Sequence, residues 1–148
     1  MGILKSITDL HFVSALDYAS GTADRTGAAL DMLGFRGVLM VVKFATIAAG
    51  AVTTIKAQQG AIANLSDAAD LAGTGQTVAD DDDNQIFVID LFEPVKRYVR
   101  LFVDKDASNA SGESAYYIQY GAQQRPTTVA VADLVSYERH RSPAEGTA

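Results

Sequence analysis

Acidic side chains are the most concentrated chemical groups in this sequence. The run Asp80, Asp81, Asp82 and Asp83 places four carboxylates next to one another, and hard cations such as Ca²⁺ bind clustered carboxylate oxygens. The alternating ligands, central Gly and terminal Glu of an EF-hand loop are absent, so these four residues are weak candidates for an irregular metal site. A block of like charges more commonly forms a solvated loop, and we favour that interpretation.

The residues that usually carry catalysis are scarce. The chain has two histidines, His11 and His140, and both lie near a chain end. A Ser-His-Asp triad needs a histidine held in a cleft, and two distant histidines do not form a metal-binding cluster. Residues 73–75 (Gly-Thr-Gly) lack the spacing and the downstream lysine of a phosphate-binding loop. We therefore expect a protein that is not an enzyme and that uses no cofactor.

Composition narrows the class of protein further. The 148 residues include 18 acids, 12 Lys or Arg and no Cys, which gives a formal charge of −6. This length suits one domain with its own core. Acidic chains gain little from polyphosphate, so we expect no nucleic-acid partner. No apolar run is long enough to span a bilayer, and residues 1–16 lack the pattern of a secretory signal, so we expect no membrane partner.

Short segments of period-2 alternation predict β-strands along most of the chain. The run at residues 38–45 is apolar, β-branched and bounded by Gly, which is typical of a central strand buried on both faces. The last strand carries Tyr116, Ile118 and Tyr120 on one face, where packing in the core or at its rim is the commoner role of tyrosine. Ser66 is a candidate cap for a single helical turn. The last strand is the one predicted at residues 114–124, and further strands are predicted at residues 28–33 and 51–58.

Residues 85–104 read as a β-hairpin around which the domain is organised. Two β-rich runs flank the turn at Glu93 and Pro94, and proline presets the backbone angle that such turns require. Alternation places one apolar face on each strand, formed by Phe87, Ile89 and Leu91 and by Val99, Leu101 and Val103.

The two ends of the chain differ from this β-rich middle. Residues 1–20 predict an N-terminal arm, either a short helix or an extended segment, because helical spacing starts and then breaks at Phe12. Residues 125–148 predict a C-terminal arm or tail, in which 127–135 form either one more strand or an extended arm. We therefore predict an all-β protein: an antiparallel β-sandwich, jelly-roll-like, of seven or eight strands over residues 21–124, with an extended arm at each end.

Three features together resemble a known family. They are a Thr/Gly turn that leads into residues 29–35 (ALDMLGF) and an apolar strand, an acidic loop in mid-chain, and residues 96–100 (KRYVR), which open a strand that is followed by a Gly/Ser turn and one more strand. Over residues 20–122 the chain resembles the small head decoration, or cement, proteins that are encoded near the major capsid protein of tailed bacteriophages. The extra segment 124–148 departs from the shorter members.

The resemblance implies a virion structural protein with a compact antiparallel β domain. Such proteins bind the outer surface of the phage capsid and stabilise the head. Their partners are the major capsid protein and further copies of themselves, most often as trimers, with dimers as an alternative. The implied location is the virion, after synthesis in the cytoplasm of the bacterial host.

The residues expected to contact neighbouring subunits come from the two arms and from the start of the second hairpin strand. The arginines among them have an equally good structural interpretation, because their stems can cover apolar surface. The candidates are Ile3, Leu4, Ile7, Leu10, Phe12, Arg97, Tyr98, Arg100, Val129, Val131, Leu134 and Tyr137.

Two other functions stay open on the sequence. Another head–tail morphogenesis component, such as a connector or a tail-end ring protein, would form a closed ring of fixed subunit number. A carbohydrate-binding β-sandwich would use the Tyr116 face and the acidic run, and a chelator would abolish its binding. The absence of Trp counts against this last alternative.

Overall fold

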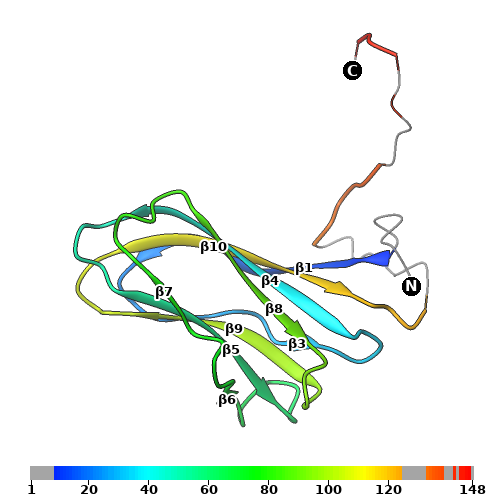
Figure 1. The fold of residues 1–148 in the computed structure, drawn as a ribbon, viewed down its shortest axis with the longest axis horizontal. Helices are drawn as coiled ribbons and strands as arrows, with labels where there is room; N and C mark the ends of the chain where they lie inside the picture. The colour runs from blue at the N-terminus through cyan, green and yellow to red at the C-terminus, as the bar shows by residue number, and fades with distance from the viewer. Residues whose placement is uncertain (1–8, 125–132, 139–141, 143, 148) are drawn as a thin grey trace.

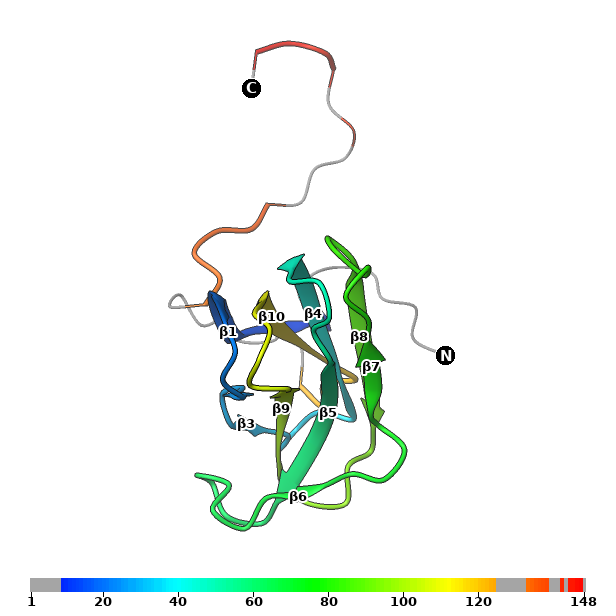
Figure 2. The ribbon, with the colours of Figure 1, turned by 90° about the vertical axis from the view of Figure 1, so that its left-hand side faces the viewer.

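The protein folds as a two-layer β-sandwich (Figures 1 and 2). The computed structural model describes residues 9–124, 133–138, 142 and 144–147. Every strand pairing in this part of the chain is antiparallel. The predicted all-β sandwich is thus confirmed. None of the described residues belongs to a helix that is long and apolar enough to cross a membrane.

In the described part of the chain, four of the six long strands belong to sheet A and two to sheet B. Sheet A has the order β1-β10-β4-β8, and in sheet B the strands β9 and β5 form the centre, with short strands on both sides. The strands of sheet A are β1 (His11–Gly21), β10 (Ser111–Tyr120), β4 (Gly37–Ile47) and β8 (Ile86–Phe92). Those of sheet B are β2 (Arg25–Thr26), β3 (Leu30–Asp31), β9 (Tyr98–Lys105), β5 (Thr53–Gly60), β6 (Ala69–Asp70) and β7 (Gln76–Val78).

Alternating apolar side chains of the two sheets meet between the layers to form the core. Strand β4 contributes Val38, Met40, Val42 and Phe44, all fully buried, and it lies between β10 and β8 as a central strand. Its other face is less enclosed than the sequence indicated, because Lys43 is exposed. The predicted inner faces of β8 and β9 are confirmed: Ile89, Val99, Leu101 and Val103 are buried, and Phe87 and Leu91 pack against them.

The predicted hairpin of residues 85–104 is wrong, although both of its strands exist. Strand β8 pairs with β4 in sheet A, while β9 pairs with β5 in sheet B. The turn at Pro94 therefore carries the chain from one sheet to the other. Alternation specifies which face of a strand is buried but not its neighbour, and the two apolar faces meet across the core instead of lying side by side.

Three further elements differ from the sequence-based prediction. Residues 11–20, predicted as part of an arm, form most of β1, so the boundary of the β domain lies before His11. The strand predicted at 28–33 is reduced to the two residues of β3. No helical turn forms at Ser66; a turn is present there instead, in which the Asp67 carboxylate accepts hydrogen bonds from the backbone N–H groups of Ala61 and Ile62.

A buried tyrosine joins the two layers at the centre. Tyr117 of β10 is fully buried; its hydroxyl accepts a hydrogen bond from the Leu101 N–H and donates one to the Ala28 carbonyl, both at 2.9 Å. Only Gly fits at residue 27 beside this hydroxyl, because a Cβ there would lie 2.5 Å from the Tyr117 hydroxyl oxygen. Burial raises the pKa of this phenol, so that it stays protonated.

A buried ion network joins the layers at one end. Glu113 of β10 is fully buried; one carboxylate oxygen lies 2.9 Å from Arg25 Nη1 and the other 3.0 Å from Lys105 Nζ. Lys105 also donates to the carbonyls of Gly21 and Ser111, at 3.0 and 2.9 Å. Among the described residues, every buried side-chain nitrogen or oxygen has a hydrogen-bond partner. The charges are therefore enclosed without being left uncompensated.

The phenol of Tyr117 yields a first prediction. Tyr117→Phe leaves the Leu101 N–H and the Ala28 carbonyl without their partner inside the core, which costs about 1–3 kcal/mol of unfolding free energy in urea titrations. Tyr120→Phe is the matched control, since its hydroxyl bonds Asp90 at the surface. Equal losses in both variants would contradict the role given to Tyr117.

The ion network yields a second prediction. Glu113→Leu leaves the Lys105 ammonium buried without its carboxylate partner and lowers the unfolding free energy by about 3–5 kcal/mol. Adding Lys105→Met to that variant removes the stranded charge, so the double variant is more stable than Glu113→Leu alone. Urea unfolding of the four proteins in this cycle measures the coupling. A double variant with the summed loss of both single variants would show that the pair is not coupled.

Candidate functional site

The chain enters and leaves the β domain at the same end of sheet A. His11, the first residue of β1, is paired with Gln119 of β10, and β10 ends one residue later, at Tyr120. Tyr120 is opposite Gly37, which is opposite Phe92. We call this the arm end of the sandwich. Both predicted arms therefore start from neighbouring strands.

Two of the three segments on which the predicted family resemblance rests, residues 29–35 and 96–100, meet at the arm end. Leu30 of β3 is paired with Val99 of β9, and the Met32 N–H donates to the Arg97 carbonyl at 2.9 Å. The Arg97 guanidinium holds the Asp31 carboxylate through two hydrogen bonds of 2.8 and 2.7 Å. This contact lowers the pKa of Asp31 below its ordinary value. Segments more than 60 residues apart in sequence thus form one local structure.

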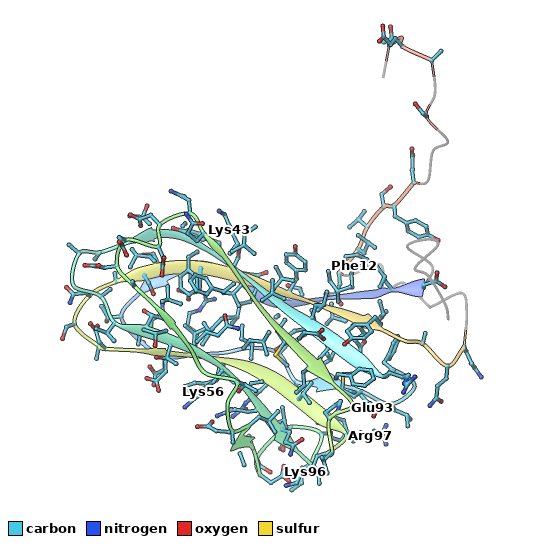
Figure 3. All side chains as sticks on the ribbon, viewed as in Figure 1. Phe12, Lys43, Lys56, Glu93, Lys96 and Arg97 are labelled. Carbon is cyan, nitrogen blue, oxygen red and sulfur yellow. The ribbon has the colours of Figure 1, made fainter. Side chains whose placement is uncertain are left out.

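An open groove of about 580 Å³ lies between these segments. Its walls are residues 32–36 and residues 93–97. Glu93, Lys96 and Arg97 of the second wall lie near one another in Figure 3. A salt bridge of 2.5 Å joins Arg36 to Glu93 across the groove, and the Glu93 N–H donates to the Arg36 carbonyl at 2.7 Å. The Gln123 N–H donates to the Gly34 carbonyl at 2.9 Å, which fixes the start of the C-terminal segment beside the groove.

The rim of the groove combines cations with exposed apolar side chains. Arg36, Lys96 and Arg97 supply positive charge, with Arg36 and Arg97 each paired to a carboxylate. Leu33 is 68% and Val95 91% exposed. Apolar groups ringed by charge are suited to contact with another protein surface.

The acidic run lies at the opposite end of the sandwich, where its carboxylates bind backbone amides. Asp80 accepts from Gly50 N–H and Asp83 from Ile47 N–H, both at 2.6 Å, while Asp82 accepts from Ala79 N–H at 2.8 Å. These bonds hold the β4–β5 connection. In the part of the chain that the structure describes, no three His, Asp or Glu side chains are grouped so that they could hold a metal ion.

Asp106 performs the same task in the β9–β10 turn nearby. Its carboxylate accepts hydrogen bonds from the N–H groups of Ser108, Asn109 and Val52. These donors favour the ionised form and lower the pKa of Asp106 to about 2. The acidic end is therefore a set of loops organised by carboxylate–amide bonds.

The outer face of sheet A is a second candidate surface. Tyr116, Ile118 and Tyr120 lie on this outer face, not in the core, because Tyr117 and its alternate neighbours face inward. The Tyr120 hydroxyl donates to Asp90 at 2.5 Å; burial and this carboxylate raise the pKa of Tyr120. Tyr116 is the most exposed of the three.

Several predicted partner-binding residues can now be placed. Arg97 lies over the ring of Tyr98, 5.2 Å from its centroid, and Arg100 Nε donates to Gln58 Oε1 at 2.7 Å, so these side chains have structural contacts of their own. Leu10, Phe12 and Leu134 are half-buried, and Tyr137 is exposed. The remaining candidates, Ile3, Leu4, Ile7, Val129 and Val131, lie outside the described residues.

Sequence reasoning missed most of the groove and the outer face. The groove residues Arg36 and Glu93 carry no motif, because they come together only when the residue before β4 and the residue after β8 meet at the arm end. The outer face had a readable signal: Ile86 and Val88 alternate with the core residues of β8, which makes both faces of that strand apolar. The chain matches neither a known family model nor a curated protein.

Asp106 provides a prediction about pH. Its folded pKa of about 2 lies below the ordinary value of 3.8, so its contribution to stability is complete above pH of about 4 and is lost as pH falls through about 2. Asp106→Asn therefore lowers the thermal midpoint at pH 7, and the difference from the parent protein shrinks towards pH 2. Asp81→Asn is the control, since no such backbone bond is present at Asp81 in the described structure. A pH-independent difference for Asp106→Asn would contradict this account.

Proposed function

We propose that this protein is a virion structural protein that binds the outer surface of a phage capsid and stabilises the head. One observation carries the proposal: two of the three segments on which the family resemblance rests assemble, through Asp31 and Arg97, into a single grooved surface at the arm end. The described ends of the chain lie beside that surface: His11 stacks on Phe35, and Gln123 lines the groove. A binding module needs such a continuous contact area rather than a reactive centre.

The architecture supports this proposal in two further ways. The buried network around Glu113 and the hydrogen bonds of the Tyr117 hydroxyl fix the two sheets against each other, so the contact surface is preorganised. Weak contacts repeated over many capsid sites give avidity without a tight single site. The partners are then the major capsid protein and neighbouring copies of this chain, in the mature virion.

The polarity of the sandwich suggests its orientation on the shell. The arm end, with Val95 and the paired arginines, faces the capsid. The acidic loops with Asp80 and Asp83 lie at the other end and face solvent, where like charge limits association between particles.

Co-sedimentation with expanded capsids that lack this protein tests the proposal. We expect saturable binding at many copies per head and a higher temperature of shell disruption. Val95→Glu on the groove rim lowers the affinity at least tenfold, whereas Val52→Glu, an exposed valine beside Asp80 at the acidic end, leaves it unchanged. Absence of binding by the parent protein would overturn the proposal. A closed ring without shell binding would favour the connector alternative.

Truncation tests the contribution of the N-terminal arm. The deletion must end at residue 8, because β1 begins at His11 and a longer deletion removes a strand of sheet A. We expect the variant that lacks residues 2–8 to keep the β-sheet circular dichroism spectrum and to sediment with capsids more weakly. Unchanged binding would show that this arm makes no capsid contact.

A further inference from the structure

The outer face of sheet A is more apolar than a solvated sheet face requires. In one row across the sheet, Tyr116 is paired with Val41 and Val41 with Val88. In the next row, Phe12, Ile118 and Leu39 are apolar, and Asp90 of β8 ends the row. Antiparallel sheets with one solvated face normally alternate apolar and polar residues. An outer face on which apolar residues outnumber the polar ones, Ser14, Lys43 and Asp90, is typical of a surface that another chain segment covers.

One described segment of the chain already lies against this face. Asp133 and Leu134 line a depression of about 290 Å³ together with Phe12, Ser14 and Tyr116. Leu134 is half-buried there, while the other members of residues 133–138 are exposed. An apolar side chain of this segment is therefore suited to the outer face of sheet A.

The same segment carries apolar side chains that its own sandwich leaves uncovered. Val135 is 82% and Tyr137 45% exposed. Figures 1 and 2 show the segment running away from the body on the side of sheet A. Leu134 lies with residues of β1 and β10, whereas Val88, 42% exposed, is on β8 at the opposite edge of the sheet. Uncovered apolar groups thus remain on both the segment and the face.

We propose that a second copy of the chain brings these surfaces together. Residues 133–138 of one copy pack across the outer face of sheet A of another copy, with Val135 and Tyr137 on the apolar surface around Val88. The exchange uses the same kind of contact that Leu134 makes within one chain, and such exchange is a common route to homo-oligomers. This association takes place in free solution and does not rest on the proposed capsid binding.

Sedimentation velocity of the full chain over micromolar to hundred-micromolar concentrations tests the inference. We expect a concentration-dependent oligomer. Val88→Lys, and separately truncation after residue 132, weaken the association at least tenfold while the β-sheet circular dichroism spectrum is retained. Val52→Lys is the matched control, because Val52 is also exposed, at 60%, but lies at the acidic end. A monomer at every concentration, or an oligomer insensitive to both changes, would overturn the inference.

Disulfide trapping identifies the contact directly, because the natural chain has no cysteine. Copies that carry Tyr137→Cys, mixed with copies that carry Val88→Cys, should give a disulfide-linked heterodimer under mild oxidation. Copies with Val52→Cys in place of Val88→Cys should not. If both cysteines in one copy form only an intramolecular bond, the segment covers its own face and the inference is wrong. Failure here leaves the capsid assay unaffected, and failure of that assay leaves this one unaffected.

Discussion

The sandwich depends on one carboxylate that is enclosed between two cations. An isolated charge in the interior would be strongly destabilising, but Glu113 is held by Arg25 on one oxygen and Lys105 on the other, and the remaining donors of Lys105 reach backbone carbonyls. Arg25 and Lys105 belong to sheet B, and Glu113 belongs to sheet A. A slip of β10 by one residue would turn Glu113 to the outside and leave both cations unpaired. The network therefore specifies the register of β10 more strictly than apolar packing does.

Strand β10 has further buried polar residues that bind the opposite sheet. Its inward residues at the centre and far end, Tyr117 and Gln119, are polar and buried, and each binds the backbone of sheet B or of its connections: Tyr117 at Leu101 and Ala28, Gln119 at the Asp31 carbonyl. Directional bonds thus replace part of the apolar core on this strand. Because Asp31 also holds Arg97, the groove at the arm end is connected through two hydrogen-bonded residues to the interior. The surface proposed to bind the capsid is positioned by the same strand that fixes the layers.

The sequence predicted which face of each strand is buried but not which strand it pairs with. Alternation correctly identified the inward residues of β8 and β9, including Ile89 and Leu101, because burial depends on the local period alone. We predicted a hairpin because a proline turn joins the two strands. A turn that carries the chain from one sheet to the other has the same composition, so the sequence does not distinguish the two cases. Arg25 and Glu113 form an ion pair although they are 88 residues apart in sequence, and no local sequence pattern predicts this contact. For the same reason the acidic run could be predicted as a loop, while the amides that its carboxylates bind could not.

The points at which the chain enters and leaves the β domain follow from topology rather than from any special sequence. The first and last long strands, β1 and β10, are antiparallel neighbours, so the chain must enter and leave at one end. The acidic loops must then lie at the other end, because β4 runs its whole 11 residues from Gly37 to the Asp83 contact at Ile47, a distance of about 35 Å at the usual rise of a strand. A partner that engages both arms therefore also meets the groove around Arg97, and it meets none of the concentrated negative charge. One strand pairing thus separates the surface suited to binding from the surface suited to solvent.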